Sequence, residues 1–174
     1  GASAAGSREP RNAGLEDAAL DRTLPCMGSI ERKKITVVGA GYVGSTCAHL
    51  CALKELATEI VLIDVIEGRP QGIALDMNQS AAVEGFGSRV VGTNDPKATS
   101  GSDVVIVTAG IPRKPGMSRS DLLATNAKII LSVAEYVRNG SPEAIVIVVT
   151  NPLDSMVHLF RAKSGFPGKR VVGM

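Results

Sequence analysis

Residues 33–64 read KKITVVGAGYVGSTCAHLCALKELATEIVLID, and this stretch decides the fold. It begins with a short apolar run, Ile35–Gly39, that ends in the pattern G-x-G-x-x-G. A segment with helical spacing, Tyr42–Leu56, follows, and a second apolar run, Glu59–Asp64, ends in a carboxylate. The order of strand, glycine turn, helix and strand predicts the first βαβ unit of a dinucleotide-binding sheet.

Each glycine of the turn has its own physical role in such a unit. Gly39 permits the tight turn, Gly41 lets the backbone approach a pyrophosphate, and Gly44 lets the helix pack close to the sheet. The helix N-terminus offers free N–H groups to phosphates. The alternative is a tight turn with no ligand. The predicted cofactor residues of this unit are Gly39, Ala40, Gly41, Tyr42, Val43, Gly44 and Asp64.

Asp64 indicates which dinucleotide would bind. It lies 64 − 44 = 20 residues after Gly44, where a carboxylate that binds the ribose hydroxyls is expected. A carboxylate there would repel a 2′-phosphate, so the sequence favours NAD over NADP. A helix-capping role for Asp64 is the alternative.

Apolar runs and helical segments alternate through the rest of the chain. The predicted elements are a helix over Gly68–Val83, strands over Arg89–Thr93 and Asp103–Gly110, a helix over Asp121–Arg138, a strand over Ala144–Pro152, a helix over Leu153–Lys163 and a strand over Arg170–Met174. Nearly all-apolar strands between helices are typical of a parallel sheet buried on both faces. We therefore predict an α/β fold with a doubly wound Rossmann sheet in the order 3-2-1-4-5-6, with helices on both faces and a ligand crevice between strands 1 and 4.

The first helix carries two further expectations. Val43, Cys47, Leu50 and Leu53 can share one stripe, which predicts the buried face. Cys47 and Cys51 lie four residues apart, and a metal pair is conceivable, but two small apolar side chains in the core are favoured, so no metal site is predicted. The three cysteines form no disulfide framework, which favours a reducing compartment.

Composition limits the domain organisation and the partners. The net charge of +2 does not favour nucleic acid or an anionic membrane, and no apolar run approaches the ~20 residues that cross a bilayer. Residues 1–31 are rich in Gly, Ala, Ser and charge, which predicts a poorly ordered tail before a domain over 32–174. No signal peptide is recognisable, so a cytoplasmic protein is expected. The sequence stops within the sixth predicted strand, and we expect a C-terminal domain to be absent.

The segment Gly110–Ser120 leaves the fourth strand at the mouth of the predicted crevice. It carries Arg113, Lys114 and Arg119 among prolines and a glycine. A guanidinium presents a fixed fork that suits a carboxylate, and the prolines and glycine suggest a lid with defined hinges. Charge alone would favour a solvated basic loop.

Three longer stretches bear a family resemblance. DVIEGRPQGIALDM, AGIPRKPGMSRSDLLATNAKI and VTNPLDSM resemble the lactate/malate dehydrogenase family, in particular the bacterial malate dehydrogenases whose sequences resemble lactate dehydrogenase. The resemblance covers residues 32–174. It implies an NAD-dependent malate dehydrogenase of the tricarboxylic acid cycle, present here as its cofactor-binding half, with malate and oxaloacetate as substrates.

The resemblance also assigns roles to individual residues. It implies that Arg113 grips the distal carboxylate of the substrate, where lactate dehydrogenases carry an uncharged residue. A buried cation opposite a methyl group would be left unpaired, which agrees with this selectivity. Arg119 resembles the catalytic arginine that polarises the reacting carbonyl. Asn126 matches a position near the cofactor. Val149, Thr150 and Asn151 match the strand end beside the nicotinamide, and Asn151 also reaches the substrate.

The resemblance implies that the proton-transfer histidine lies beyond the sixth strand. His49 and His158 are the only histidines, and packing or surface roles are expected for both. A lactate or other 2-hydroxyacid dehydrogenase is the alternative enzyme, and the chain by itself would be a dinucleotide-binding module without catalysis. The helix Gly68–Val83 packs between subunits in this family, which implies a homo-oligomer, either a dimer or a tetramer.

Overall fold

The structure is a computed structural model that describes Gly1 and residues 33–174. The expectations for the tail over 1–31 and for Cys26 therefore lie outside the described residues, apart from the terminal glycine. The compact unit that the sheet builds, Glu31–Met174, is described by itself.

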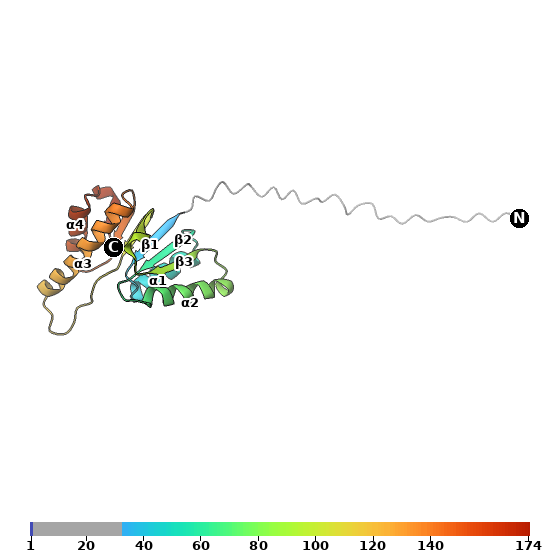
Figure 1. The fold of residues 1–174 in the computed structure, drawn as a ribbon, viewed down its shortest axis with the longest axis horizontal. Coiled ribbons are helices and arrows are strands. Elements are labelled where there is room, and N and C mark those ends of the chain that lie inside the picture. The colour runs from blue at the N-terminus through green and yellow to red at the C-terminus, as the bar shows by residue number, and fades with distance from the viewer. Residues whose placement is uncertain (2–32) are drawn as a thin grey trace. The chain divides into compact units, whose positions relative to one another are not determined.

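Six parallel strands form one sheet (Figure 1). In chain order they are β1 Lys34–Val38, β2 Glu59–Ile63, β3 Arg89–Thr93, β4 Val104–Val107, β5 Ile145–Val148 and β6 Val171–Gly173. Their order across the sheet is β3-β2-β1-β4-β5-β6, which confirms the predicted fold class and topology. The order reverses at β1, so the crevice expected of such a sheet lies between β1 and β4.

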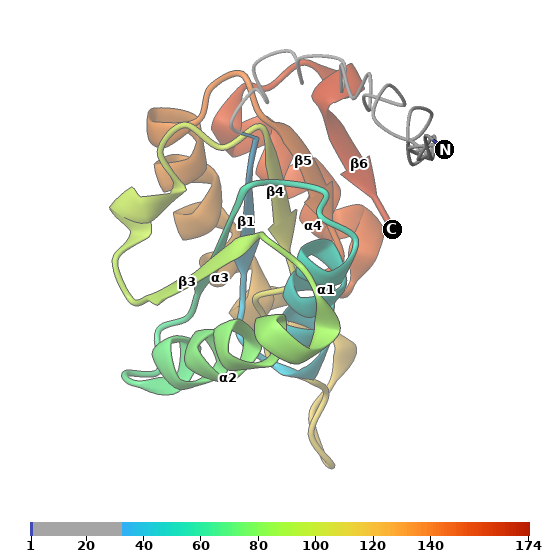
Figure 2. The ribbon, with the colours of Figure 1, turned by 90° about the vertical axis from the view of Figure 1, so that its right-hand side faces the viewer.

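Four helices connect the strands. They are α1 Tyr42–Leu53, α2 Arg69–Glu84, α3 Arg119–Gly140 and α4 Leu153–Ser164, with short 3₁₀ turns η1 Pro96–Thr99 and η2 Gly168–Arg170. One buried cluster joins α1 and α2 to one face of the sheet, and a second joins α3 and α4 to the other (Figure 2). Among the described residues, no helix has the length and apolarity needed to span a membrane.

Alternation along the strands divides the core between the two faces. In β1, Ile35 and Val37 belong to the α1–α2 cluster, whereas Val38 belongs to the α3–α4 cluster. In β4, Val105 and Val107 pack toward α3 and α4. Because side chains alternate with a period of two, both faces of these strands must be apolar, and this explains their nearly unbroken Val and Ile runs.

The predicted buried stripe of α1 was wrong. Val43 and Leu50 are 54% and 47% exposed, and Cys47 and Leu53 are only partly buried. The residues that α1 buries are smaller: Gly44, Ala48, Cys51 and Ala52. The helix lies close against the sheet at its first turn, so small side chains fill the contact and the larger apolar ones lie outside it.

The start of α3 also differs from the prediction. The helix begins at Arg119, two residues before the expected Asp121. The Ser118 side chain accepts a hydrogen bond from the backbone of Asp121, and the Asp121 carboxylate accepts one from the backbone of Ser118. This reciprocal capping box fixes the first turn, so the loop after β4 ends at Ser118 rather than at Ser120.

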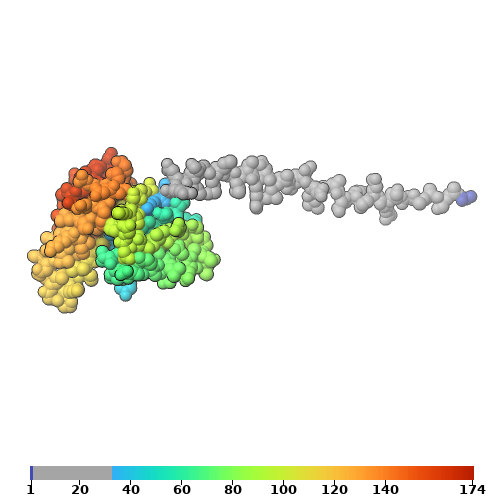
Figure 3. All heavy atoms as spheres, viewed as in Figure 1, coloured from blue at the N-terminus to red at the C-terminus, as the bar shows by residue number. Residues whose placement is uncertain are grey.

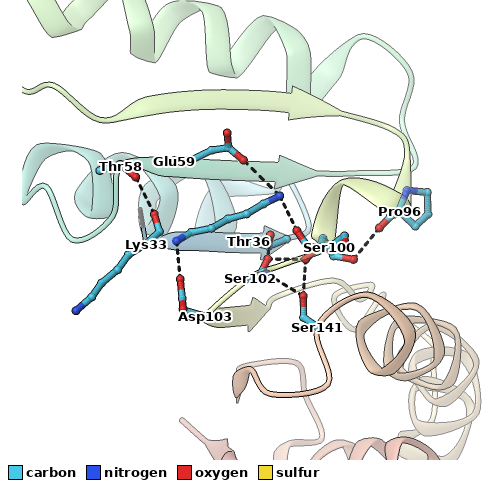
Figure 4. Close-up of polar contacts among 11 residues, drawn as sticks. Lys33, Thr36, Thr58, Glu59, Pro96, Ser100, Ser102, Asp103 and Ser141 are labelled. Atoms are coloured by element: carbon cyan, nitrogen blue, oxygen red, sulfur yellow. Dashed lines mark hydrogen bonds and ion pairs between the residues drawn. The ribbon is translucent and has the colours of Figure 1, made fainter. Parts of the chain in front are cut away.

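A buried polar network closes the amino end of the sheet (Figure 4). The hydroxyls of Thr36 and Ser102 lie 2.7 Å apart, and the Ser141 hydroxyl accepts from the Ser102 backbone at 2.9 Å and donates to Thr99 O at 2.6 Å. Lys34 donates to Ser100 O at 2.9 Å. These bonds tie β1 to the segments that precede β4 and β5, so this edge is held together by protein groups.

Candidate functional site

The carboxyl ends of the strands form one row at the opposite edge. The register pairs Val38 with Ile63 on one side and with Val107 on the other, and Val107 with Val148. The residues that follow these strand ends therefore lie in one row, and those on adjacent strands are about 5 Å apart. They include Gly39, Asp64, Thr108 and Val149, of which all but Thr108 were predicted site residues.

The glycine turn is tightly constrained at its ends and open in its middle. Gly39 has φ +107°, and a Cβ there would lie 2.8 Å from the backbone nitrogen of Ala109. A Cβ at Gly44 would overlap the carbonyl oxygen of Gly39. A Cβ at Gly41 would meet nothing within 4 Å. Gly39 and Gly44 are thus required by the protein itself, whereas nothing in the described protein requires Gly41.

The N-terminus of α1 is free to meet an anion. Gly41 is the cap residue and provides no side-chain hydrogen bond, and the first turn holds no acidic residue. By contrast, the N-terminus of α3 is occupied by its own Ser118 and Asp121. Tyr42 is 92% exposed at the start of α1 and Val43 is half-exposed, so both predicted residues are accessible beside the open N–H groups.

Asp64 joins the turn to the end of β2. One carboxylate oxygen accepts from the backbone N–H of Ala40 at 2.6 Å, and the other accepts from Ile66 N–H at 2.9 Å. An ionised carboxylate has about four acceptor positions, so two remain after these bonds. The side chain is partly exposed and could accept two ribose hydroxyls. Val65 and Ile66 are exposed apolar neighbours that could lie against a base.

Asn94, after β3, supports this region and was not predicted. Its Nδ2 donates to Asp64 O at 2.7 Å and to Ile66 O at 3.0 Å, and its Oδ1 accepts from Gln71 Nε2 at 2.6 Å. Asn94 thus holds the loop that carries Asp64. The only signal in the sequence was a polar residue directly after a strand, and ordinary turns have the same signal.

Thr108 is a second supporting residue that sequence reasoning missed. Its hydroxyl lies 3.0 Å from Val38 O and 3.1 Å from Gly39 O, directly against the glycine turn. A Cβ at Gly44 would also come within 2.7 Å of that hydroxyl oxygen. Strand β4 therefore supports the turn of β1 across the switch point of the sheet.

The end of β5 meets the end of β4 through Thr150 and Asn126. The Thr150 hydroxyl donates to Ala109 O at 2.8 Å, and Asn126 Nδ2 donates to Asn151 O at 2.7 Å. Val149 is partly buried and Thr150 is buried, whereas Asn151 is exposed. The structure therefore brings these four predicted residues together at one place on the edge.

The loop Gly110–Ser118 extends beyond the body of the domain (yellow in Figures 2 and 3). Lys114 O accepts from Met117 N–H at 3.1 Å around Gly116, whose φ is +82°. Arg113 is exposed, and its Nε donates to Met117 O at 3.1 Å, which leaves the terminal Nη atoms without a hydrogen bond to any described residue. The fork that would bind a carboxylate is accessible.

Arg119 lies in the first turn of α3 rather than in the loop. A cation at a helix N-terminus is disfavoured by the helix dipole, so this position does not stabilise the helix. Arg119 is exposed at the carboxyl edge of the sheet. An anionic ligand at this edge would compensate both the positive charge of Arg119 and the positive end of the helix dipole.

The remaining candidate groups lie away from this edge. His49 lies about two turns into α1 and its Nε2 is buried without a hydrogen-bond partner among the described residues, while His158 is exposed on α4. Burial, reinforced by Cys47, raises the pKa of the Cys51 thiol. Residues 33–174 contain no cluster of three or more ligands that could hold a metal ion.

These features fit a dinucleotide. The open N-terminus of α1 and the free space at Gly41 suit a pyrophosphate, and the unused acceptors of Asp64 suit a ribose. The strand ends at Val149 and Asn151 lie on the other side of the switch point. Fold and site together define a dinucleotide-binding domain of the doubly wound class.

The family follows from comparison with known sequences. The family described as lactate/malate dehydrogenase, NAD binding domain, matches residues 33–173, and the chain belongs to it. This confirms the predicted family and the predicted cofactor, NAD. Malate dehydrogenases of Chloroherpeton thalassium and Rhodopirellula baltica are 56% and 55% identical over 141 and 146 residues. These alignments cover 81% and 83% of this chain and 46% of each relative, so the chain spans about half the length of the curated relatives it matches.

Solved structures agree in fold. A Cryptosporidium parvum malate dehydrogenase has a TM-score of 0.78 at 52% identity, covering 82% of this chain and 45% of that one. A lactate dehydrogenase from the same organism, complexed with lactic acid and NAD, has the same TM-score at 50% identity, covering 83% of this chain and 45% of that one. Overall structural similarity therefore does not distinguish malate dehydrogenases from lactate dehydrogenases as relatives of this chain.

Proposed function

We propose that this chain is the cofactor-binding half of an NAD-dependent malate dehydrogenase, which interconverts malate and oxaloacetate. The observation that carries the choice of substrate is Arg113. It lies on an exposed loop that begins beside the ends of β4 and β5, with its terminal nitrogens accessible. Identity above 50% to proteins named malate dehydrogenase supports the same choice.

Each residue has a definite role in this proposal. Arg113 binds the distal carboxylate with its planar fork, and Arg119 donates to the carbonyl oxygen on which charge develops. Asn151 orients the substrate at the end of β5. Gly39–Gly44 bind the pyrophosphate, Asp64 binds the adenosine ribose, and Val149 and Thr150 shape the nicotinamide side. When bound, NAD accepts a hydride from C2 of malate and NADH returns it.

The second candidate is a lactate dehydrogenase, which the Cryptosporidium parvum neighbour makes a specific alternative. Pyruvate has a methyl group where oxaloacetate has its second carboxylate. A closed loop that placed Arg113 against a methyl group would desolvate the cation without a partner. This cost favours malate and oxaloacetate for this chain.

The chain alone is proposed to bind NAD without turning over substrate. Hydride transfer to or from an alcohol requires a proton-transfer group beside the oxygen. Neither His49 nor His158 lies at the strand ends. The general acid or base is therefore proposed to lie in the part of the relatives that this chain does not span.

We also propose a homo-oligomer located in the cytoplasm. Leu75 and Val83 of α2 are 57% and 87% exposed, which suits the subunit contact that the family resemblance implies. Cys47 and Cys51 are free thiols, which suits a reducing compartment. Analytical ultracentrifugation of the purified protein would distinguish dimer from tetramer.

The test compares oxaloacetate with pyruvate, using the product of the complete reading frame that contains this sequence. We expect kcat/KM to be larger for oxaloacetate, and Arg113→Gln to lower it about a hundredfold while raising that for pyruvate. A wild-type preference for pyruvate would contradict the proposal. NADH binding to the 174-residue chain, followed by fluorescence, tests the cofactor role separately.

A further inference from the structure

The turn that follows β2 is held by one side chain from the end of β3. Asn94 Nδ2 donates to Asp64 O at 2.7 Å and to Ile66 O at 3.0 Å, so one amide group bridges both ends of the turn. These bonds reach 30 and 28 positions back along the chain. Within the turn, the Asp64 carboxylate accepts from Ile66 N–H. The backbone of the proposed ribose-binding residue is therefore fixed by a distant side chain as well as by its own turn.

The amide of Asn94 is itself oriented from helix α2. Its Oδ1 accepts from Gln71 Nε2 at 2.6 Å, and Gln71 lies in the first turn of that helix. An asparagine amide has an acceptor oxygen on one side and an NH2 donor group on the other. A donor at Oδ1 therefore determines that the NH2 group faces the two carbonyls of the turn after β2.

Helix α2 is held firmly against β3 (Figure 2). A Cβ at Gly92 would lie 1.9 Å from Pro70 O, so the two backbones meet there with no room for a side chain. Further along α2, Asn78 Nδ2 donates to Val90 O at 2.7 Å, and Asn78 Oδ1 accepts from Val90 N–H at 3.0 Å. The start of α2 therefore has a fixed position beside the carboxyl end of β3.

We propose that Asn94 and Gln71 are positioning residues of the ribose site, which hold the Asp64 carboxylate where it can accept two ribose hydroxyls and so favour NAD over NADP. Asn94 acts through the backbone of the turn after β2, and Gln71 acts through Asn94. The inference rests on the proposed function, in which Asp64 binds the adenosine ribose. It does not depend on the choice between malate and lactate.

The expected effect follows from the geometry of hydrogen bonds. A carboxylate accepts two neighbouring hydroxyls only in a narrow range of distances and angles. When the turn is loosened, only a fraction of the molecules hold Asp64 in that arrangement, and the apparent affinity falls with that fraction. NADPH has a phosphate on its 2′ oxygen and cannot make the same pair of bonds. Loss of the positioning residues should therefore weaken the binding of NADH more than that of NADPH.

Asn78 provides a matched control. Its amide also takes part in the contact between α2 and β3, but it bonds to Val90 near the start of the strand, away from the turn that carries Asp64. Asn78→Ala and Asn94→Ala remove side-chain amides of the same size. Both substitutions are expected to lower Tm, whereas only Asn94→Ala is expected to change the affinity for NADH. A merely structural role for Asn94 would make the two variants behave alike.

The measurement is a fluorescence titration with NADH and with NADPH, using the product of the complete reading frame. Asn94→Ala is expected to raise the Kd for NADH about fivefold, the usual effect of one lost hydrogen bond, and the Kd for NADPH less than twofold. Asn78→Ala is expected to change either constant less than twofold. An unchanged Kd for NADH in Asn94→Ala, an equal rise in both constants, or the same selective shift in Asn78→Ala would overturn the inference.

A double-mutant cycle tests whether Gln71 acts through Asn94. Gln71→Ala is expected to raise the Kd for NADH about threefold by itself and to have no further effect when combined with Asn94→Ala. Additive effects would overturn the role of Gln71. Because Gln71 is exposed, its substitution is expected to leave the fold intact. If Asn94→Ala does not fold, the two Kd values of Gln71→Ala decide the question by the same criteria.

Asp64→Asn, titrated in parallel, separates this inference from the proposed ribose contact. A change in the NADPH-to-NADH preference of Asp64→Asn without one in Asn94→Ala would overturn only the positioning role. An unchanged preference in both variants would overturn the ribose contact, and the positioning role with it. The expected result is a shift toward NADPH in both variants, larger in Asp64→Asn.

Discussion

The carboxylate of Asp64 accepts a hydrogen bond from the backbone N–H of Ala40 at 2.6 Å. The residue that would select the cofactor is therefore also a structural partner of the glycine turn. Its second oxygen accepts from Ile66 N–H, so the carboxylate organises the backbone on both sides of itself. Any substitution at Asp64 tests two roles, and the substitution must be chosen to separate them.

Asp64→Asn keeps one acceptor oxygen and removes the charge. One of the two backbone donors, Ala40 or Ile66, then loses its acceptor, and a 2′-phosphate is no longer repelled. We expect NADH affinity to fall about tenfold and the NADPH-to-NADH preference to shift toward NADPH. Fluorescence titration with both cofactors measures this. Glu67→Gln removes a nearby exposed charge and should leave the preference unchanged; an equal shift in both variants would contradict the assigned role.

Gly41→Ala and Gly44→Ala should separate binding from folding. A methyl group at Gly41 meets open space, so Tm should change little. The Kd for NADH should rise at least tenfold, which corresponds to a loss of about 1.4 kcal/mol of binding free energy. A methyl group at Gly44 overlaps Gly39 O, so this variant should lose several degrees of Tm. Thermal melts and NADH titration measure both effects. Unchanged NADH affinity in Gly41→Ala would show that no pyrophosphate approaches there.

Thr108→Val should weaken the support that the end of β4 gives to the glycine turn. It removes the hydroxyl that bonds Val38 O and Gly39 O but keeps the shape of the side chain. The loss of about 1 kcal/mol should lower Tm by roughly 3 °C and raise the Kd for NADH severalfold. Thr108→Ser retains the hydroxyl and should restore both values. If the serine and valine variants behave alike, the hydroxyl does not support the turn.

The Ser118–Asp121 cap should be sensitive to acid. Hydrogen bonds from the Ser118 hydroxyl and backbone hold the pKa of Asp121 below its usual value of 3.8. A depressed pKa in the folded state gives stability that is present above that value and is lost as the pH falls through the folded pKa. Ser118→Ala should therefore lower Tm near neutral pH, and the difference from wild type should shrink below pH 3.8. Ser120→Ala is the control; a difference independent of pH would exclude the carboxylate.

The sheet and the glycine turn could be predicted because their causes lie in short segments. The run Ile35–Gly39 favours a buried strand because it is short, rich in β-branched residues and bounded by glycine. The spacing from Gly44 to Asp64 is fixed by one helix and one strand. The order of strands then followed from right-handed crossovers, and the structure has that order.

The packing of α1 could not be predicted in the same way. Hydrophobicity pointed to Val43, Cys47 and Leu50, but the closeness of the helix to the sheet selects Ala48 and Ala52. That closeness depends on Gly44 meeting Gly39, a contact between two backbones that leaves no apolar pattern. The start of α3 differs in this respect, because the Ser118-x-x-Asp121 spacing could have predicted it.

The supporting residues of the site were missed for a third reason. Thr108 and Asn94 act on segments far away in the sequence, and each resembles an ordinary residue after a strand. Only the row of strand ends, with Val38 beside Ile63 and Val107, shows what they hold. Polar residues at the carboxyl ends of parallel strands are therefore candidates for support even where no motif includes them.

The contact between Thr108 and Gly39 also sets an order of events during synthesis. The two residues are 69 positions apart, so at 5–20 residues per second the ribosome needs roughly 3 to 14 s to supply the threonine after the glycine. Until then the β1–α1–β2 unit exists without β4, its neighbour across the switch point. We expect a nascent chain that ends before Thr108 not to retain NADH. Binding of NADH should therefore begin only after β4 has been synthesised.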